Sequence, residues 1–593
     1  MDTRFLRRSL ALSVAAFLLL SACTHSERVP DPDGDVLTWS IWNGYDKFLN
    51  LLNETYPDIE LELTPYTGRN RTGYSWAQMR GDDIPDIFIT SQILDKELAK
   101  ERLLDLSGYD FVNSFSTRIL DQMAIDGGIY LLPVNYAMYG IFYNKTLMEE
   151  YGWEVPRNFA ELESLCAEIE AAGLIPGVIG TQLTGGSFST VFNLAKTSWL
   201  TTPAGMDWER DFLAGNATAK GVWEETMDYV QRYIDMGMFY TDPEDRNDPQ
   251  LILDYLGNRK AVFCTVVTTV NITAFPDTGD ELGMMPFISE DGSKNIYMYS
   301  PVSYLGISKR LLEPGNEKKL ENAIRILSLI YSNEGQTTLI SEETPCVMSV
   351  IDSGEIPEDS LIYDAQQAFW DGRAFRMTYA GWENNLVNIG QAYKEWFRKE
   401  NDMDGAQCIS RMDELQNSSL TQSDLLYFCE STTDFTLEET AKLIGKALGS
   451  AVGADAAMIS VGEFHERYGE LKSSVTGKLY AGKINDEIIN TICPSNEGGY
   501  AIMSMTGAQA KQLAQEGFDA DGNGNPYPYI LVTRGDKELV DSEVYAVAFL
   551  NKGYTEKVSQ KNLAEIHDGS LLDFLRIWLV EQKRVSPDGN PWE

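Results

Sequence analysis

The sequence predicts an α/β protein with more than one domain, and three observations predict this class. The chain has 593 residues, which is too long for a single hydrophobic core. Its composition is that of ordinary globular protein, with 43% hydrophobic and 11% aromatic residues. Strand-like apolar runs alternate with amphipathic helical patterns from residue 35 onward. Strands separated by helices imply parallel sheets joined by right-handed crossovers.

The N-terminus has the pattern of an exported protein. A basic segment containing Arg4, Arg7 and Arg8 precedes an apolar run over 10–20, which is too short to cross a bilayer stably. The run ends in Leu-Ser-Ala directly before Cys23. This ending resembles the bacterial lipobox, in which the Cys is lipidated and becomes the mature N-terminus.

The lipobox resemblance implies how the first residues are processed. Residues 1–22 would be a signal peptide, and Cys23 would carry acyl chains such as palmitate, which anchor the protein to the membrane. Polar, turn-prone residues over 23–34 then form a flexible tether. The resemblance therefore places the protein on the extracellular face of the cell membrane, held by its N-terminal lipid.

The first elements after the tether follow one another as strand, helix and strand. Apolar and alternating runs predict strands over 36–41, 59–63 and 86–89. An amphipathic pattern predicts a helix over 45–56, which Pro57 ends. These elements form the β-α-β start of an α/β domain.

The later part of the chain divides into helical segments, a linker and a second α/β region. Helices are predicted over 159–172, 217–236 and 318–333. A Ser/Thr/Gln-rich stretch then indicates a linker, which we place over 413–430. Beyond it, the pattern predicts a helix over 437–451 and a strand over 456–460. There are no internal repeats and no second membrane segment.

Charge and residue usage exclude several classes of function. A net charge of −41 opposes binding to nucleic acid and to the face of an anionic membrane. With only three His and no C-x-x-C pair, a Cys/His zinc site is not expected. Six Cys follow Cys23, and nothing in their spacing selects disulfide partners: Cys166, Cys264, Cys346, Cys408, Cys429 and Cys493.

The segment over 35–412 resembles the bacterial extracellular solute-binding proteins that serve ABC importers, in particular the sugar-binding group. Five motifs carry the resemblance in order: LTWSIW over 37–42 with YPDI over 56–59, DIPDI over 83–87, LP at 132–133 with IFYNK over 141–145, VP at 155–156 with Phe159, and GISK over 306–309 with SNEGQ over 332–336. The resemblance implies two α/β lobes joined by crossing strands, with a ligand cleft between them that closes by hinge motion. The expected fold is thus two-lobed and periplasmic-binding-protein-like, followed by a smaller α/β (α+β) domain.

A carbohydrate ligand sets the chemistry of the expected cleft. Sugar C–H faces pack on aromatic rings, and sugar hydroxyls need amide or carboxylate partners. Positions after the first strand, beside the hinge motif and in irregular segments are therefore the candidate ligand residues: Trp42, Asn43, Tyr45, Asn135, Tyr136, Tyr139, Trp199, Tyr299, Trp370 and Trp382. One departure is visible over 258–267, where the loop Trp that is common in the family is missing.

Residues 431–593 resemble the C-terminal, substrate-binding domain of the 5′-nucleotidase family. The matching pieces are EET over 438–440, GADA over 453–456, GKI over 482–484, MTGAQ over 505–509 and YAVA over 545–548. The motif is altered, because Glu463 stands near the place of an Arg that would grip an anion. The family's metal-binding catalytic domain has no counterpart here, so we expect no enzyme activity, no catalytic residues and no cofactor.

One acidic turn has the oxygen spacing of a calcium loop. Asp519, Asp521 and Asn523 stand at alternate positions, but the twelfth position is Ile530, where a bidentate Glu is needed. A Gly/Asn turn is the alternative interpretation.

Three functions remain open at the level of sequence. The leading one is a lipid-anchored binding protein that delivers a sugar or oligosaccharide to an ABC permease. The second is a surface nucleotide- or nucleoside-binding protein, or a hydrolase related to the nucleotidases. The third is a sensory or scaffold lipoprotein.

Overall fold

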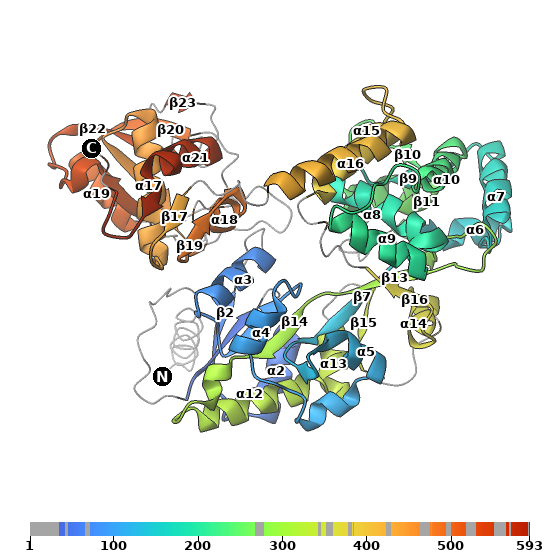
Figure 1. Cartoon of the computed structure of the whole chain (residues 1–593), viewed down its shortest axis with the longest axis horizontal. Coiled ribbons are helices and arrows are strands. Elements are labelled where there is room, and N and C mark those ends of the chain that lie inside the picture. Colours follow the sequence, from blue (N-terminus) through green and yellow to red (C-terminus); the bar gives the residue numbers. More distant parts are fainter. Residues whose placement is uncertain are drawn as a thin grey trace, which may run out of the picture.

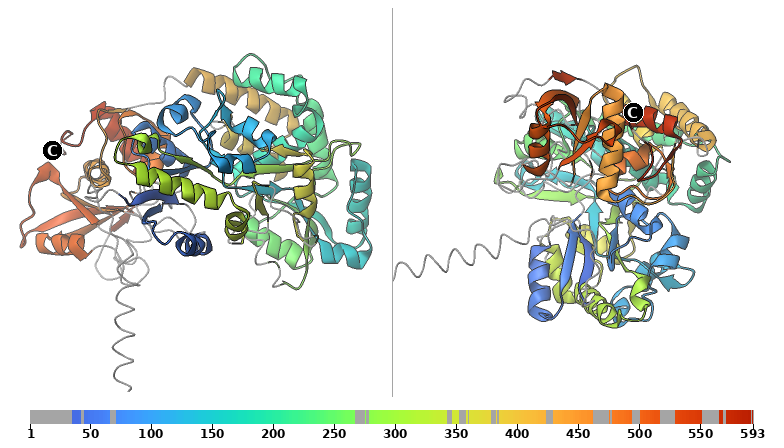
Figure 2. Two further views of the ribbon diagram at one scale, coloured as in Figure 1. Left: turned by 90° about the horizontal axis from the view of Figure 1, so that it is seen from below. Right: turned by 90° about the vertical axis from the view of Figure 1, so that its left-hand side faces the viewer.

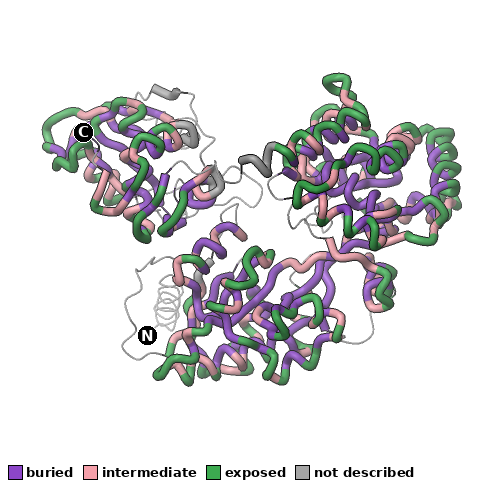
Figure 3. Tube along the Cα trace, viewed as in Figure 1, coloured by how far each residue is buried: buried purple, intermediate pink, exposed green. Residues whose placement is uncertain are grey.

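The computed structural model describes residues 35–592, with gaps at 42–44, 66–70, 267–274, 276–277, 342–345, 352–357, 359, 378–381, 383–384, 423–428, 462–474, 476, 494–499, 517–528, 551–564, 568–570 and 591. The described residues form two α/β lobes and a third, C-terminal body (Figure 1). Buried residues follow the strands of all three bodies (Figure 3). The predicted signal peptide, Cys23 and the tether over 23–34 lie outside the described residues.

The first lobe is built on a five-stranded sheet with the order β2-β1-β3-β14-β6. Strand β1 is parallel to β2 and β3, and β14 is antiparallel to β3 and β6. The strands are β1 (Leu37–Ile41), β2 (Leu61–Pro65), β3 (Ile87–Thr90), β6 (Leu132–Pro133) and β14 (Tyr304–Ile307). The other elements of this lobe are α2 (Asp46–Thr55), α3 (Arg71–Arg80), α4 (Lys96–Arg102), η1 (Asp110–Ser114), α5 (Thr117–Met123), the hairpin β4 (Ala124–Ile125) and β5 (Gly128–Ile129), η5 (Lys309–Leu312), α12 (Glu317–Ile330) and α13 (Asn333–Ile340).

The second lobe repeats this plan with the strand order β10-β9-β11-β8-β12. Its strands are β8 (Ile141–Asn144), β9 (Ile175–Ile179), β10 (Tyr240–Thr241), β11 (Ala261–Thr265) and β12 (Leu282–Met285). Its helices are α6 (Lys145–Tyr151), α7 (Phe159–Ala171), α8 (Thr184–Ala195), the π-helix η2 (Lys196–Leu200), α9 (Pro203–Leu213), α10 (Glu224–Asp235), α11 (Asp248–Leu251), the π-helix η3 (Ile252–Gly257), α15 (Leu386–Phe397) and α16 (Gly405–Gln422).

A separate four-stranded sheet connects the two lobes, and we call it the hinge sheet. Its order is β15-β7-β13-β16. The strands are β7 (Asn135–Tyr139), β13 (Tyr297–Pro301), β15 (Val347–Ser349) and β16 (Ala374–Arg376), with α14 (Tyr363–Trp370) before β16. The chain passes from the first lobe to the second through β7, returns through β13, and enters the second lobe again between β16 and α15. This triple crossing confirms the predicted two-lobe fold.

The third body is a smaller α/β domain. Its main sheet has the order β21-β18-β22-β20-β23, beside a small sheet β19-β17-β24. The strands are β17 (Cys429–Ser431), β18 (Ala456–Ser460), β19 (Gly482–Ile484), β20 (Tyr500–Thr506), β21 (Tyr529–Thr533), β22 (Val544–Leu550), β23 (Glu565–His567) and β24 (Arg584–Val585). The helices are α17 (Leu437–Val452), α18 (Asp486–Ile492), α19 (Gly507–Glu516), η6 (Arg534–Asp536) and α21 (Leu571–Gln582).

Several predicted elements are confirmed to within a residue or two, because capping fixes their ends. Helix α17 begins with a reciprocal capping box between Thr436 and Glu439, and it ends at Gly453 in the left-handed conformation, with φ 69°. Helix α2 ends just before Pro57, as predicted.

The linker predicted over 413–430 differs from the structure. Helix α16 continues through its first ten residues, to Gln422. Gln416 is buried, and its amide donates hydrogen bonds to the carbonyl oxygens of Phe212 and Leu213 in the second lobe. Polar composition indicated a linker, but the polar side chains belong to a helix that packs on the second lobe through a few apolar and amide contacts.

The C-terminal body contacts the first lobe, although α16 joins it to the second (Figures 1 and 2). Asp83, just after α3, accepts hydrogen bonds from Lys478 Nζ at 2.6 Å and from the Tyr480 hydroxyl at 3.1 Å. The Tyr480 ring lies directly over Gly81, where a Cβ atom would clash with it. We call this set of contacts the docking contact.

Two further findings complete the fold. Across the described ranges, no helix has the length and apolarity needed to cross a bilayer. The six cysteines that follow Cys23 are all buried free thiols.

Candidate functional site

The hinge sheet has two faces that belong to different cores. Because side chains alternate along a strand and residues opposite one another share a face, the register divides β7 and its neighbours into two sets. One set packs with the second lobe, and we call it the second-lobe face: Asn135, Ala137, Tyr139, Met298, Ser300 and Phe375. The other set packs with the first lobe and includes Tyr136, Met138, Tyr297 and Tyr299.

Asn135 is the most unusual polar group on the second-lobe face. Its side chain is fully buried, at 0% exposure, yet among the described residues neither its amide nitrogen nor its amide oxygen has a hydrogen-bond partner. The hydroxyl of Ser303, two residues beyond the end of β13, is in the same state. A buried polar group without a partner costs about 1–3 kcal/mol. Such a group is suited to receive a hydroxyl from a ligand, so Asn135 remains a candidate ligand residue.

Tyr139 lies on the same face and offers a ring. It is half-buried, its hydroxyl accepts a hydrogen bond from Ser300 Oγ at 3.2 Å, and burial raises its pKa. The phenol therefore stays neutral and can act as a hydrogen-bonding group on the same face as Asn135, four residues further along β7, so Tyr139 stays a candidate ligand residue.

Tyr136 and Tyr299 point to the opposite face, which corrects their prediction as ligand residues. Their rings meet edge to face at 5.2 Å between centroids, and both contact Phe369, at 5.2 and 4.8 Å. The Tyr299 hydroxyl also interacts with Gln122 of α5. The prediction treated neighbouring tyrosines as one group, but the strand period of two separates Tyr136 from Asn135 and Tyr139.

Trp382 is also corrected, because its ring is part of the second lobe's core. It is 0% exposed and is packed among Phe188, Phe192 and Phe212. Its indole N–H donates to Glu209 Oε1 at 2.8 Å. Both the ring and the polar edge are therefore occupied within the protein.

The two other predicted tryptophans stay half-buried. Trp199 donates through its indole N–H to Thr226 Oγ1 at 2.9 Å and packs edge-on against Trp208. Trp370 meets Phe369 edge to face at 5.0 Å, on the first-lobe side of the hinge sheet. Trp199 belongs to η2 and Trp370 to α14, so neither residue is part of the second-lobe face of the hinge sheet.

Of the remaining predicted residues, one lies in the core and the others lie outside the described residues. Tyr45 is 5% exposed, belongs to the first lobe's core and has φ 49° at the start of α2. Trp42 and Asn43 lie outside the described residues, as do the calcium-loop positions Asp519, Asp521 and Asn523.

Lys196 is a candidate that sequence reasoning missed. It is the single charged residue in the stretch over 184–200, which is otherwise apolar, small or neutral. It follows Asn193 by three residues, so the two side chains lie on one face of the helix. The Asn193 amide oxygen is buried and has no hydrogen-bond partner in the part of the chain that the structure describes. An isolated Lys in an apolar helix is the signal that would have found this site.

The Lys196 ammonium lies between aromatic rings. Its Nζ is 4.8 Å from the ring centroid of Phe192 and 4.9 Å from that of Phe375 on the second-lobe face. The residue is only 3% exposed, and burial lowers its pKa to about 8. Among the described residues, no acceptor hydrogen-bonds to Nζ and no carboxylate lies within ion-pair distance.

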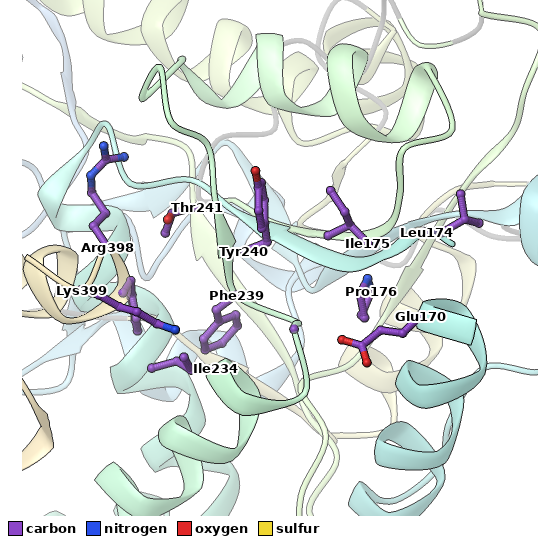
Figure 4. Close-up of a pocket in the computed structure, with 12 residues that line it drawn as sticks. Glu170, Leu174, Ile175, Pro176, Ile234, Phe239, Tyr240, Thr241, Arg398 and Lys399 are labelled. Carbon is purple, nitrogen blue, oxygen red and sulfur yellow. The ribbon is translucent and has the colours of Figure 1, made fainter. Parts of the chain in front are cut away.

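A separate hollow lies at the outer edge of the second lobe. Its volume is about 400 Å³, and its walls come from the ends of α7 and α15 and the starts of β9 and β10 (Figure 4). Glu170, Tyr240 and Lys399 line it, and none of the predicted ligand residues does. Within the described ranges, no group of three His, Cys, Asp or Glu side chains is arranged to hold a metal ion.

The fold consists of two α/β lobes joined by the hinge sheet. The family model of the bacterial extracellular solute-binding proteins matches residues 43–337. The match lies within the two-lobed part and covers just under half of this chain.

The chain is also similar to individual proteins. The multiple sugar-binding protein of Streptococcus mutans serotype c is 26% identical over 175 residues, which cover 28% of this chain and 41% of that protein. The binding protein MsmE of Bacillus subtilis, in an open conformation, has a TM-score of 0.53 at 15% identity, with 66% of this chain and 100% of that chain covered. The cyclic α-maltosyl-1,6-maltose binding protein of Arthrobacter globiformis has a TM-score of 0.50 at 16% identity, with 65% and 99% covered.

Proposed function

We propose that this protein captures a carbohydrate between its two lobes and delivers it to an ABC importer. The observation that carries the proposal is the second-lobe face of the hinge sheet. There, the unpartnered amide of Asn135 lies on the same face as the rings of Tyr139 and Phe375. An amide that needs partners, on the same face as aromatic rings, suits a ligand that is long enough to reach both and that carries hydroxyl groups and apolar C–H faces.

The similar proteins support a carbohydrate ligand. The relative from Streptococcus mutans is described as a multiple sugar-binding protein, and the Arthrobacter globiformis protein binds a cyclic maltose-derived sugar. The chain matches less than half of the former's length, so the ligand class here rests on the hinge sheet as well.

We further propose that Cys23 carries the lipid that holds this binding domain beside its permease on the outer face of the membrane. The C-terminal body would be a non-catalytic relative of the 5′-nucleotidase substrate domain. The predicted order of helix α17, strand β18 and helix α19 supports this relationship. The altered motif positions, including Glu463, lie outside the described residues.

The test compares two buried amides in the full mature chain. Asn135→Leu removes an unpaired amide, so the unliganded protein should keep its melting temperature or gain a few degrees. Gln336→Met is the matched control, because Gln336 is also 0% exposed but its amide donates to the carbonyls of Val134 and Ile330 and accepts from Ser349. The control should lower the melting temperature.

Ligand binding is then measured by calorimetry with a panel of neutral and acidic mono- and oligosaccharides, nucleosides and nucleotides. A saccharide should bind the wild type, and Asn135→Leu should weaken it at least tenfold or so, which corresponds to about 1.4 kcal/mol. A chain that binds a nucleoside and no saccharide contradicts the proposal.

A further inference from the structure

Lys196 and its surroundings form a charged position at the hinge that the proposed sugar site does not explain. The residue begins η2 at the end of α8, and its ammonium reaches the ring of Phe375 in β16. Phe375 lies on the second-lobe face in the same row as Tyr139, at the other end of that face from Asn135. The positive charge is therefore at the Tyr139 end of the face on which we propose that the ligand binds.

The protein itself only partly compensates this charge. An ammonium over an aromatic ring gains about 0.5–2 kcal/mol, which is less than the cost of removing an ion from water. The nearest acidic influence comes from Glu209 of α9, which lies beyond ion-pair distance. One oxygen of that carboxylate already accepts the indole N–H of Trp382. Among the described groups, nothing pairs with Lys196 directly.

We propose that Lys196 Nζ receives the carboxylate of an acidic saccharide, so that the ligand class narrows to sugars that contain a uronic acid. This inference rests on the proposed function. A carboxylate would supply the missing acceptor, and a charge-assisted hydrogen bond is about twice as strong as a neutral one. The adjacent unpaired amide oxygen of Asn193 can accept a sugar hydroxyl, and the Phe375 ring can pack on a C–H face.

The acidity of the whole protein does not oppose this specificity. A net charge of −41 repels anions at long range, but at physiological salt the field of exposed charges decays over about 8 Å. A buried ammonium acts at short range and in a low dielectric, where it is screened much less. The local charge therefore determines which sugar the site prefers once the ligand has entered.

The experiment compares two ligand pairs that differ only by carboxylates: digalacturonate with galactobiose, and cellobiouronate with cellobiose. Affinities are measured by calorimetry on the mature wild type, on Lys196→Met, and on the control Lys260→Met. Lys260 is exposed and lies 5.7 Å from the ring of Tyr255 in the same lobe. Far-ultraviolet circular dichroism and urea unfolding confirm that each variant is folded.

We expect the uronide of one pair to bind the wild type at least tenfold or so more tightly than its neutral partner, which is about 1.4 kcal/mol. Lys196→Met should bring this ratio close to one, while Lys260→Met keeps it. If the neutral sugar of either pair binds the wild type as tightly as the uronide of the same pair, the carboxylate inference fails and the proposed function stands. If no saccharide binds at all, the proposed function fails with it.

Discussion

Lys196 illustrates how one buried charge sets the pH dependence of stability. Burial lowers its pKa from 10.5 to about 8 in the folded protein. Below about pH 8 the lysine is protonated in both the folded and the unfolded state, so the folded protein carries the full cost of the desolvated charge. Between that pH and 10.5 the unfolded chain holds more protons, and the contribution of this group to stability rises with pH.

Lys196→Met should therefore stabilise the unliganded protein at neutral pH. The expected gain in the free energy of unfolding is roughly 2–3 kcal/mol at about pH 7, and it should shrink toward zero at about pH 10. Urea unfolding of wild type and variant at both pH values measures the difference. A gain that grows with pH, or a variant that is less stable at neutral pH, would show that the ammonium is paired in the folded protein.

The sequence predicted individual candidate residues only where a polar or aromatic side chain stands next to a recognisable motif. Asn135 and Tyr139 stood out beside the hinge motif, and both lie on the second-lobe face. Tyr136 was grouped with them because sequence proximity hides the alternation of a strand. Trp382 was assigned to an irregular segment, and only tertiary packing shows that three Phe rings enclose it.

At the scale of elements, the closeness of α8 and α15 depends on one glycine. A Cβ atom on Gly390 of α15 would lie well inside contact distance of the Thr184 carbonyl oxygen at the start of α8. The first turns of the two helices can approach because this position has no side chain.

Gly390→Ala should force the two helices apart and lower the free energy of unfolding by about 1–3 kcal/mol, the usual cost of overpacking. Gly185→Ala is the matched control on the partner helix, because a Cβ there would meet only Leu386 Cδ1, at 3.4 Å. That variant should change stability by less than about 1 kcal/mol in either direction. Equal melting temperatures for the two variants would mean that the helices can separate freely.

Element boundaries were predictable where the chain carries explicit stop and start residues. Pro57 marks the end of α2, and the Thr436–Glu439 capping box marks the start of α17. The prediction of a linker over 413–430 was wrong for its first ten residues, because composition alone does not distinguish an exposed helix end from a loop. Gln416 looks like a linker residue, and only the carbonyls of Phe212 and Leu213 identify it as part of the fold.

At the scale of the whole molecule, the docking contact between the C-terminal body and the first lobe can be tested directly. Asp83→Ala removes the acceptor shared by Lys478 and Tyr480, a partly exposed pair whose loss should weaken docking by about 1 kcal/mol, or roughly fivefold. Hydrogen exchange should quicken in α3 and α18, which pack together at this contact.

Asp58→Ala is the control for this measurement. Asp58 pairs with Arg325 at 2.8 Å on the same lobe, away from the docking contact. Its loss should leave exchange in α3 and α18 unchanged. If both variants, or neither, alter exchange in those helices, Asp83 does not hold the C-terminal body in place.

Through the docking contact, the end of the chain returns to the lobe in which the described residues begin. The chain runs from the first lobe through the hinge sheet to the second, along α16, and back to the first lobe at Asp83. In terms of linkage, the docked body behaves as a tethered ligand of the first lobe. If docking differs in strength between the open and closed lobes, a sugar that favours one arrangement must change docking by the same factor by which docking changes sugar affinity. The affinity of any partner that competes for the docking face would then depend on whether the binding site is occupied.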